Sequence, residues 1–147
     1  DFPRCINWVT LRDRETGGEF VFLNAHLDPQ NETIRLNSAM LIVDQMKQIA
    51  GERPVIMVGD WNAQLTSSTV SYFTSNGFEN VRFTAEESSN LGTWHEWEKR
   101  EPNSWLFGDI IFASEGKTHI TKFDVLTDKY DGKYPSDHHP LVADIYY

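Results

Sequence analysis

The sequence predicts an α/β fold built from packed layers of strands and helices. Three observations support this prediction: apolar segments of strand length occur along the whole chain, one long segment has helical periodicity, and a short continuous apolar run follows that segment. Such a run, between a helix and a glycine, is typical of a central strand covered on both faces. The 147 residues are expected to form one domain, and the pattern leaves open whether the sheet is parallel or mixed.

The first predicted elements are a β-hairpin and a long helix. Residues 4–13 and 19–27 are rich in Val, Ile, Phe and Trp, and the polar segment 14–18 between them is a turn signal. Residues 31–50 carry apolar side chains at steps of three and four, which predicts an amphipathic helix that ends at Gly51. These apolar positions are Leu36, Ala39, Met40, Val43, Met46 and Ala50.

The predicted central strand follows this helix and is itself followed by a shorter helix. Residues 54–58 are the continuous apolar run, and polar residues begin directly after it. Ser67 or Ser68 is expected to cap a short helix through Ser75, because serine side chains accept hydrogen bonds from the first free N–H groups of a helix. Gly77 is expected to terminate that helix.

The last part of the chain is predicted to be mainly strands and loops. Residues 78–84 are predicted to form a brief strand, and residues 86–104 form a polar, loop-like segment. Three further strands are predicted, over residues 109–113, 120–126 and 141–146. The turn-rich segment 128–140 separates the last two of these strands.

Composition and charge exclude several classes of protein. Apolar residues make up 39% of the chain, which argues against a disordered tail. No apolar run approaches the roughly 20 residues that a membrane-spanning helix needs. The net charge of −9 disfavours binding to long nucleic acids, because their affinity depends on neutralising phosphates. Cys5 is the single cysteine, so no disulfide forms within the chain.

Four polar clusters stand where predicted strands meet loops. They are Asn24-Ala25-His26-Leu27-Asp28, Gly59-Asp60-Trp61-Asn62-Ala63, Asp109, and Ser136-Asp137-His138-His139-Pro140. This edge of a layered α/β fold commonly binds ligands, because side chains there have rigid support and face solvent. Carboxylate and amide oxygens suit Mg²⁺, Mn²⁺ or Ca²⁺, and an imidazole beside an acid can carry positive charge next to a phosphate. The clusters therefore supply the groups that phosphoester hydrolysis needs.

Each cluster taken alone has a simpler interpretation. Asp28 before Pro29 is typical of a turn or helix-cap residue, and Asp60 followed by Asn62 is typical of an Asx turn. His26 or Asp109 alone would be an ordinary hydrogen-bonded residue at a strand end, and the Ser136–Pro140 segment a solvated loop. No function is assigned to His95, His119 or His139, and the aromatic residues Trp94, Trp97 and Trp105 are interpreted as packing residues.

The order of the clusters resembles the endonuclease/exonuclease/phosphatase superfamily over essentially all of the chain. The motifs that carry the resemblance are Asn-x-His-Leu-Asp, Gly-Asp-Trp-Asn-Ala, Asp-Ile-Ile-Phe and Ser-Asp-His-His-Pro-Leu-Val. The second and fourth motifs are specific together and weak apart. With the segment 130–135 before the last motif, the arrangement looks most like uncharacterised bacterial members of the superfamily.

The resemblance implies a role for each of five catalytic residues. His26 would bind or protonate the scissile phosphate, Asp60 would orient or activate water, and Asn62 would steady the phosphate or the metal. His138 would contact the phosphate, and Asp109 would hydrogen-bond the imidazole of His138 and favour its charged form. The substrate is thus expected to be a phosphoester, cleaved as a phosphodiesterase, nuclease or phosphatase would cleave it.

The resemblance also implies a metal site. Asp60, Asn62 and Asp137 would be its ligands, and the expected cofactor is Mg²⁺, with Mn²⁺ or Ca²⁺ as alternatives. Two departures stand out: Phe107-Gly108-Asp109 replaces the common Arg-Ile-Asp, and Trp61 stands where Phe is common. The family's N-terminal half, with an Asn near its first strand and a metal-binding Glu, has no counterpart in this chain.

By this resemblance the fold is deoxyribonuclease I-like, and the chain is the C-terminal half of a four-layer α/β/β/α sandwich, with a mixed sheet and helices on one face. If each half supplies one sheet, the inner face of this sheet is exposed over far more than the few hundred Å² usual for monomers. We therefore expect the missing N-terminal half, or self-association, to cover it.

Three functions remain open from the sequence. The first is metal-dependent hydrolysis of a phosphoester by the complete domain, with the isolated chain inactive. The second is a catalytically incompetent fragment that acts as a binding or structural module. The third, supported only by acidity and loops, is a calcium-binding adhesion module. The net charge favours a small phosphoester over long nucleic acid for the first function.

Overall fold

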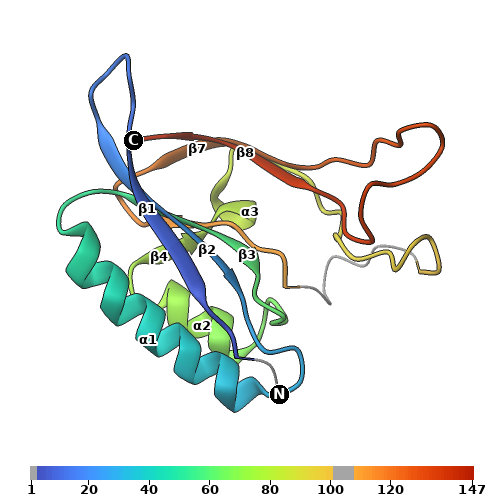
Figure 1. Ribbon diagram of the computed structural model, residues 1–147. Helices are drawn as coiled ribbons and strands as arrows, with labels where there is room; N and C mark the ends of the chain where they lie inside the picture. The colour runs from blue at the N-terminus through green and yellow to red at the C-terminus, as the bar shows by residue number, and fades with distance from the viewer. Residues whose placement is uncertain (1–2, 101–107) are drawn as a thin grey trace.

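The protein consists of a layer of helices, a five-stranded sheet and a smaller three-stranded sheet (Figure 1). The computed structural model describes residues 3–100 and 108–147. The helices α1 and α2 cover one face of the larger sheet, and the smaller sheet lies over the other face (Figure 1). The sequence prediction of a mixed α/β fold is confirmed. None of the helices in these residues is long and apolar enough to span a membrane.

The predicted N-terminal hairpin forms one edge of the larger sheet. Strands β1 (Ile6–Arg12) and β2 (Glu19–His26) pair antiparallel over their whole lengths. In the turn between them, the side chain of Asp13 accepts hydrogen bonds from the backbone N–H groups of Glu15 and Thr16, both at 2.7 Å. Because the polar turn residues satisfy one another locally, the turn fixes the register of the pair.

The predicted long helix is α1 (Glu32–Ala50), and the helix expected near Ser67 is α2 (Ser68–Thr74). The side chains of Asn31 and Ser67 cap the two helices by accepting backbone N–H bonds. Met40 was predicted on the apolar face of α1, but it is 43% exposed. The buried side of α1 consists of Ala39, Ile42, Val43, Met46 and Ala50.

The larger sheet has the strand order β1-β2-β3-β6-β4. The predicted central strand is β3 (Val55–Asp60), which runs parallel to β2 and antiparallel to β6 (Phe112–Ser114). Helix α1 forms the crossover between β2 and β3, as a parallel pair requires. The residue pattern alone left the sheet type open, whereas the resemblance implied a mixed sheet, and the structure confirms that the sheet is mixed.

The segment predicted as a strand over residues 78–84 is only partly a strand. It pairs with β6 as β4 (Phe78–Asn80) and then turns into the short helix α3 (Val81–Thr84). The change occurs because the side chain of Asn80 accepts the backbone N–H of Arg82 at 3.1 Å, a local bond that competes with strand pairing. The polar segment after α3 contains the two-residue strand β5 (Glu87–Ser88).

The smaller sheet is formed by β5, β7 (His119–Val125) and β8 (Leu141–Tyr146), in the order β5-β7-β8. The expectation that this chain supplies one sheet only is therefore wrong. The reason is that Ile120 and Phe123 of β7 pack on the inner face of the larger sheet, where they form a second apolar core around Ile56.

Part of the inner face stays open between the two sheets. A groove of about 610 Å³ separates β8 from the hairpin β1–β2 and is mainly apolar. Its lining includes Leu11, Phe20, Phe22, Ile56, Val58, Ile111, Ala143, Ile145 and Tyr147. Among the described residues, β8 has a strand partner on one side only, as has β1. Residues 101–104 of the predicted loop, together with Trp105 and Phe107, lie outside the described residues.

Candidate active site

The candidate site lies at the carboxyl ends of the parallel strands β2 and β3. His26 ends β2, Asp60 ends β3, and the two residues are direct neighbours in the register of the pair. The Nε2 atom of His26 lies 3.5 Å from Oδ2 of Asp60. Because parallel strands end at the same edge of a sheet, the first two polar clusters meet there.

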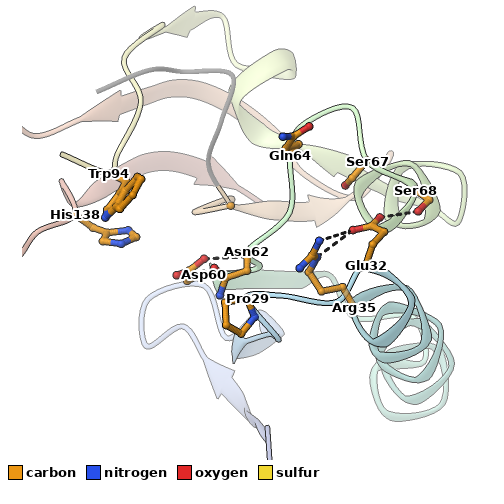
Figure 2. A pocket seen from close by; sticks show the side chains of 11 residues that line it. Pro29, Glu32, Arg35, Asp60, Asn62, Gln64, Ser67, Ser68, Trp94 and His138 are labelled. Atoms are coloured by element: carbon orange, nitrogen blue, oxygen red, sulfur yellow. Dashed lines mark hydrogen bonds and ion pairs between the residues drawn. The ribbon is translucent and has the colours of Figure 1, made fainter. Parts of the chain in front are cut away.

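The segment after β3 divides its side chains between the core and the site. Trp61 is fully buried, and its indole N–H donates to the carbonyl of Ile110 at 2.9 Å. The side chains on either side of it, Asp60 and Asn62, line a cavity (Figure 2). The Asn62 backbone N–H donates to Oδ1 of Asp60 at 2.9 Å, so the Asx turn considered from the sequence is present and belongs to the site.

Asn62 is held in an uncommon backbone conformation. Its φ is +49°, and its side-chain amide donates to the carbonyl of Leu27 at 3.1 Å. Asparagine tolerates this left-handed region better than most residues. The bond to Leu27 connects the end of β3 to the segment after β2, so it joins the first two polar clusters directly.

Gly108 explains one departure from the family motif. Its carbonyl accepts the backbone N–H of Trp61 at 2.6 Å. A Cβ atom at residue 108 would lie 2.3 Å from the backbone nitrogen of Asn62, far inside contact distance. Only glycine allows this close approach, which places Asp109 beside Asp60 in a bridge between their backbones.

Asp109 connects to the fourth cluster through His138. Oδ2 of Asp109 lies 2.6 Å from Nδ1 of His138, and it also accepts the hydroxyl of Thr93 at 2.5 Å. Thr93 is buried, with 1% of its surface exposed. The carboxylate is therefore fixed by two donors from two different loops.

Burial and hydrogen bonding, together with nearby charges, shift the pKa values of two site residues. The pKa of Asp60 is raised, first because burial disfavours its charge and then because Asp109 lies nearby; the Asn62 N–H, His26 and His138 oppose this shift. The pKa of His138 is raised, first by its hydrogen bond to Asp109, although burial works against the charged imidazole. The two shifts favour a proton on each group to higher pH than usual.

A cavity of about 760 Å³ opens beside these residues (Figure 2). Asp60, Asn62 and His138 lie at one end of it, with Trp94 near His138. The far wall comes from the N-terminal turns of α1 and α2 and from Gln64 (Figure 2). This wall includes Glu32, Arg35, Ser67 and Ser68, whereas Pro29 lines the cavity beside Asp60 and Asn62 (Figure 2).

Hydrogen bonds organise this far wall. Arg35 donates to Glu32 and, at 2.8 Å, to the carbonyl of Asp28. Glu32 accepts the hydroxyl of Ser68 at 2.6 Å, so α1 and α2 are joined at their N-terminal ends. Asp28 itself accepts the N–H groups of Gln30 and Asn31, which confirms its interpretation as a turn residue.

Three of the site residues could hold a cation. Asp60, Asp109 and His138 each offer one possible ligand atom, and these three atoms lie within 4.8 Å of one another. This donor set of two carboxylates and an imidazole fits a divalent cation. Asp137, expected as a ligand, is not part of this group and lines neither this cavity nor the one between the sheets that Asp60, Asp109 and His138 share.

The other histidines and tryptophans lie apart from the reacting groups or support them. His95 and His139 are buried and stacked, with ring centroids 4.3 Å apart. His119 lies on β7, beside Glu86. Trp94 packs under the guanidinium of Arg100 and also lines the cavity. Trp97 is 57% exposed, so the interpretation of Trp97 as a packing residue is wrong.

Sequence reasoning missed Thr93, Arg35 and Glu32 at this site. Glu32 and Arg35 are an ordinary pair of opposite charges at helical spacing, and Thr93 lies in a polar segment without periodicity. No local signal links Thr93 to the site, because its hydrogen-bond partner Asp109 lies 16 residues further along the chain. Nothing in its residue type separates it from the other threonines of the chain.

The chain resembles several solved structures. A mannosyl-6-phosphatase from Bacteroides thetaiotaomicron has a TM-score of 0.90 and 28% identity over 100% of this chain and 58% of its own. An endonuclease/exonuclease/phosphatase family protein from the same species has a TM-score of 0.89 and 29% identity, with 99% and 56% covered. A third, from Bacteroides vulgatus, has a TM-score of 0.86 and 27% identity, with 97% and 55% covered.

No protein-family model and no curated protein matches the chain. The chain spans a little more than half the length of the solved structures it resembles, which is consistent with the predicted C-terminal half. Their two family descriptions agree with the resemblance that the four motifs indicate. By fold and by sequence likeness, the chain resembles the C-terminal half of an endonuclease/exonuclease/phosphatase superfamily domain.

Proposed function

We propose that the complete domain containing this chain hydrolyses a phosphoester with the help of a divalent cation. The observation that carries the proposal is the meeting of Asp60, Asp109 and His138, whose ligand atoms lie within 4.8 Å of one another. They stand beside a cavity large enough for a small organic phosphate, about 760 Å³. One of the similar structures is a phosphatase, which supports the same reaction class.

The chain's own residues divide the work as follows. Asp60 orients or activates the attacking water, and Asn62 steadies the phosphate or the metal from its fixed backbone position. His138 contacts the phosphate as a cation, because Asp109 stabilises its charged form. His26, paired with Asp60, binds or protonates the scissile group.

The proposed ion is Mg²⁺, with Mn²⁺ or Ca²⁺ as alternatives. When bound, it supplies positive charge that offsets the phosphate. Asp60 and Asn62, two of its proposed ligands, both line the cavity, which supports this assignment. Asp137 is the third proposed ligand, and it lies close enough to His138 to favour the charge on that imidazole.

The proposed substrate is a small phosphomonoester, such as a sugar phosphate. The chain's charge of −9 disfavours long nucleic acid. The polar wall formed by Glu32, Arg35, Gln64 and the serines offers hydrogen bonds to a hydroxylated leaving group. The similar phosphatase is named for a mannosyl 6-phosphate substrate, which points in the same direction.

The test is hydrolysis by the full-length protein of four substrates: mannose 6-phosphate, p-nitrophenyl phosphate, bis-p-nitrophenyl phosphate and supercoiled DNA. We expect turnover with Mg²⁺ or Mn²⁺ that chelation abolishes, and faster cleavage of monoesters than of DNA. His138→Ala should abolish turnover, whereas His119→Ala, an exposed control on β7, should not. Turnover that resists chelation would refute the metal mechanism, and preferential DNA cleavage would refute the substrate proposal.

A second candidate function is a fragment that binds but does not catalyse. The open groove of about 610 Å³ between the sheets favours it, because apolar surface that is exposed there calls for a covering partner. We propose that this partner is the N-terminal half of the domain, or a second copy of the chain. Metal-dependent turnover by a monomeric 147-residue chain would contradict this proposal.

A further inference from the structure

We infer that Thr93 is a positioning residue for the reaction: its hydroxyl fixes the carboxylate of Asp109 and, through it, the imidazole of His138. The inference rests on the proposed function, because it assigns His138 a contact with the phosphate. It adds to the site a residue that none of the four motifs contains. Thr93 itself touches no reacting group in the proposed roles.

The geometry at Asp109 supports this role. Thr93 Oγ1 donates to Oδ2 of Asp109 at 2.5 Å, and the same Oδ2 lies 2.6 Å from Nδ1 of His138. A carboxylate oxygen accepts about two hydrogen bonds in its plane. With one position taken by the hydroxyl, the other is left for a donor, so Nδ1 of His138 carries a hydrogen and Nε2 is the atom left for other partners.

The backbone of Thr93 holds the same loop that carries His138. The carbonyl of Thr93 accepts the N–H of His139 at 2.8 Å. Two residues along, the N–H of His95 donates to the carbonyl of Asp137 at 3.0 Å. Between these bonds, Trp94 and His138 face each other across the two segments. The backbone thus aligns the loops, and the hydroxyl adds the one contact that reaches the catalytic pair.

This separation of backbone and side chain makes the inference testable. A substitution that removes only the hydroxyl leaves the backbone bonds in place. If the hydroxyl merely satisfied a buried polar group, its loss would lower stability and leave turnover per folded molecule unchanged. If it positions Asp109, its loss frees the carboxylate to rotate and the imidazole to follow.

The inference also assigns Asp109 to one of two competing roles. The carboxylate belongs to the group that could ligate a cation, together with Asp60 and His138. Because Thr93 and His138 both contact Oδ2, that oxygen is taken up by its two hydrogen bonds. Thr93 therefore favours Asp109 as the partner of the imidazole through Oδ2, and it leaves Oδ1 as the oxygen that a cation at this group would use.

The experiment compares Thr93→Val, which has nearly the same shape without the hydroxyl, with Thr93→Ser, which keeps it. In the full-length protein with Mg²⁺, we expect Thr93→Val to lower kcat about tenfold with little change in KM. Thr93→Ser should recover most of the loss. The control is Thr118→Val, which removes a hydroxyl bonded to the Glu79 carboxylate at the far end of β6, and it should leave kcat unchanged.

A second readout does not depend on turnover. The hydrogen of a short imidazole–carboxylate bond gives a strongly downfield proton NMR signal. We expect this signal for His138 in the unchanged protein and in Thr93→Ser, and its loss or upfield shift in Thr93→Val. If Thr93→Val does not fold, Thr93→Ala takes its place in both measurements.

Two results would overturn the inference. One is equal kcat in Thr93→Val, Thr93→Ser and the unchanged protein. The other is a His138 proton signal that does not respond to loss of the hydroxyl. If the unchanged protein hydrolyses no phosphoester, the proposed function fails, whereas the NMR comparison still decides whether Thr93 positions His138.

Discussion

Asp60 is a buried carboxylate next to a second carboxylate, and this makes it the residue most sensitive to a bound cation. Burial and the charge of Asp109 raise the pKa of Asp60, so the ionised form of Asp60 is disfavoured relative to an exposed aspartate. A divalent cation at the site would reverse this effect, because it favours the ionised ligand. Metal binding and ionisation of Asp60 are therefore expected to be coupled.

The first prediction follows from that coupling. Asp60→Asn keeps the shape but removes the charge, so the Mg²⁺ concentration for half-maximal activity should rise by roughly tenfold or more. The measurement is a Mg²⁺ titration of turnover in the full-length protein. Asp44→Asn, on the exposed side of α1, is the matched control and should leave the titration unchanged. Equal Mg²⁺ requirements in both variants would remove Asp60 from the metal site.

The second prediction concerns pH. Asp109 raises the pKa of His138, so the charged imidazole is present at low pH and is lost as pH rises through the raised pKa. If turnover needs this charge, its alkaline limb should move to lower pH in Asp109→Asn, which removes the main cause of the shift. A pH–rate profile of the two proteins checks this. An alkaline limb at the same pH in both would show that His138 does not act as the cation.

At the scale of elements, the parallel pair β2–β3 sets the position of the first two clusters. Gly59 makes this pairing possible: its φ is +142°, and a Cβ atom there would lie 1.9 Å from the carbonyl oxygen of Ala25. The strands would have to separate to admit any side chain. His26 and Asp60 are neighbours one residue further along the same register, so they would separate too.

The third prediction tests this close approach with a matched pair of glycines. Gly59→Ala should destabilise the fold by about 3 kcal/mol or more, since strain at a special backbone position adds to a direct clash. Gly116→Ala, at φ +70° with nothing within 4 Å of its Cβ, should cost only about 1 kcal/mol. Chemical denaturation of both variants provides the comparison. Similar losses would mean that β2 and β3 adjust easily.

How well each element could be predicted depends on the range of the forces that form it. The hairpin and α1 were predictable because turn residues and apolar periodicity are local signals. The segment 78–84 was not, because one side-chain bond of Asn80 decides between strand and helix. The four clusters were found through their motifs, but Thr93 was missed, because its role exists only once β6 and two loops meet.

For the molecule as a whole, the two sheets do not close on each other. The sequence indicated an uncovered inner face, but it could not show that β7 and β8 return to cover part of it, because that contact joins residues such as Ile56 and Phe123. The remaining groove lies beside the free edge of β8. We expect strands of a longer parent protein to fill it.

The fourth prediction concerns that groove. The isolated 147-residue chain should self-associate or bind a hydrophobic dye, and the N-terminal half added in trans should suppress both and restore turnover. Ala143→Lys places a charge in the groove and should weaken this complementation at least tenfold. Gln48→Lys, on the exposed side of α1, adds the same charge as a control. Light scattering and assays of the mixed halves are the measurements. If the isolated chain is a monomer that binds no hydrophobic dye, the proposal that the groove needs a covering partner is refuted.

The pairing of β3 with β6 has a consequence for how the protein reaches its active form. Ile56 pairs with Ala113, and the loop that carries His138 comes later still in the chain. Contacts between residues so far apart form slowly, because a long loop must close before they stabilise anything. His26 and Asp60 meet through the β2–α1–β3 unit, but Asp109 and His138 can join them only near the end of folding. Partly folded chains, including those still emerging from the ribosome, should therefore hold Asp60 beside His26 before the imidazole of His138 completes the proposed site.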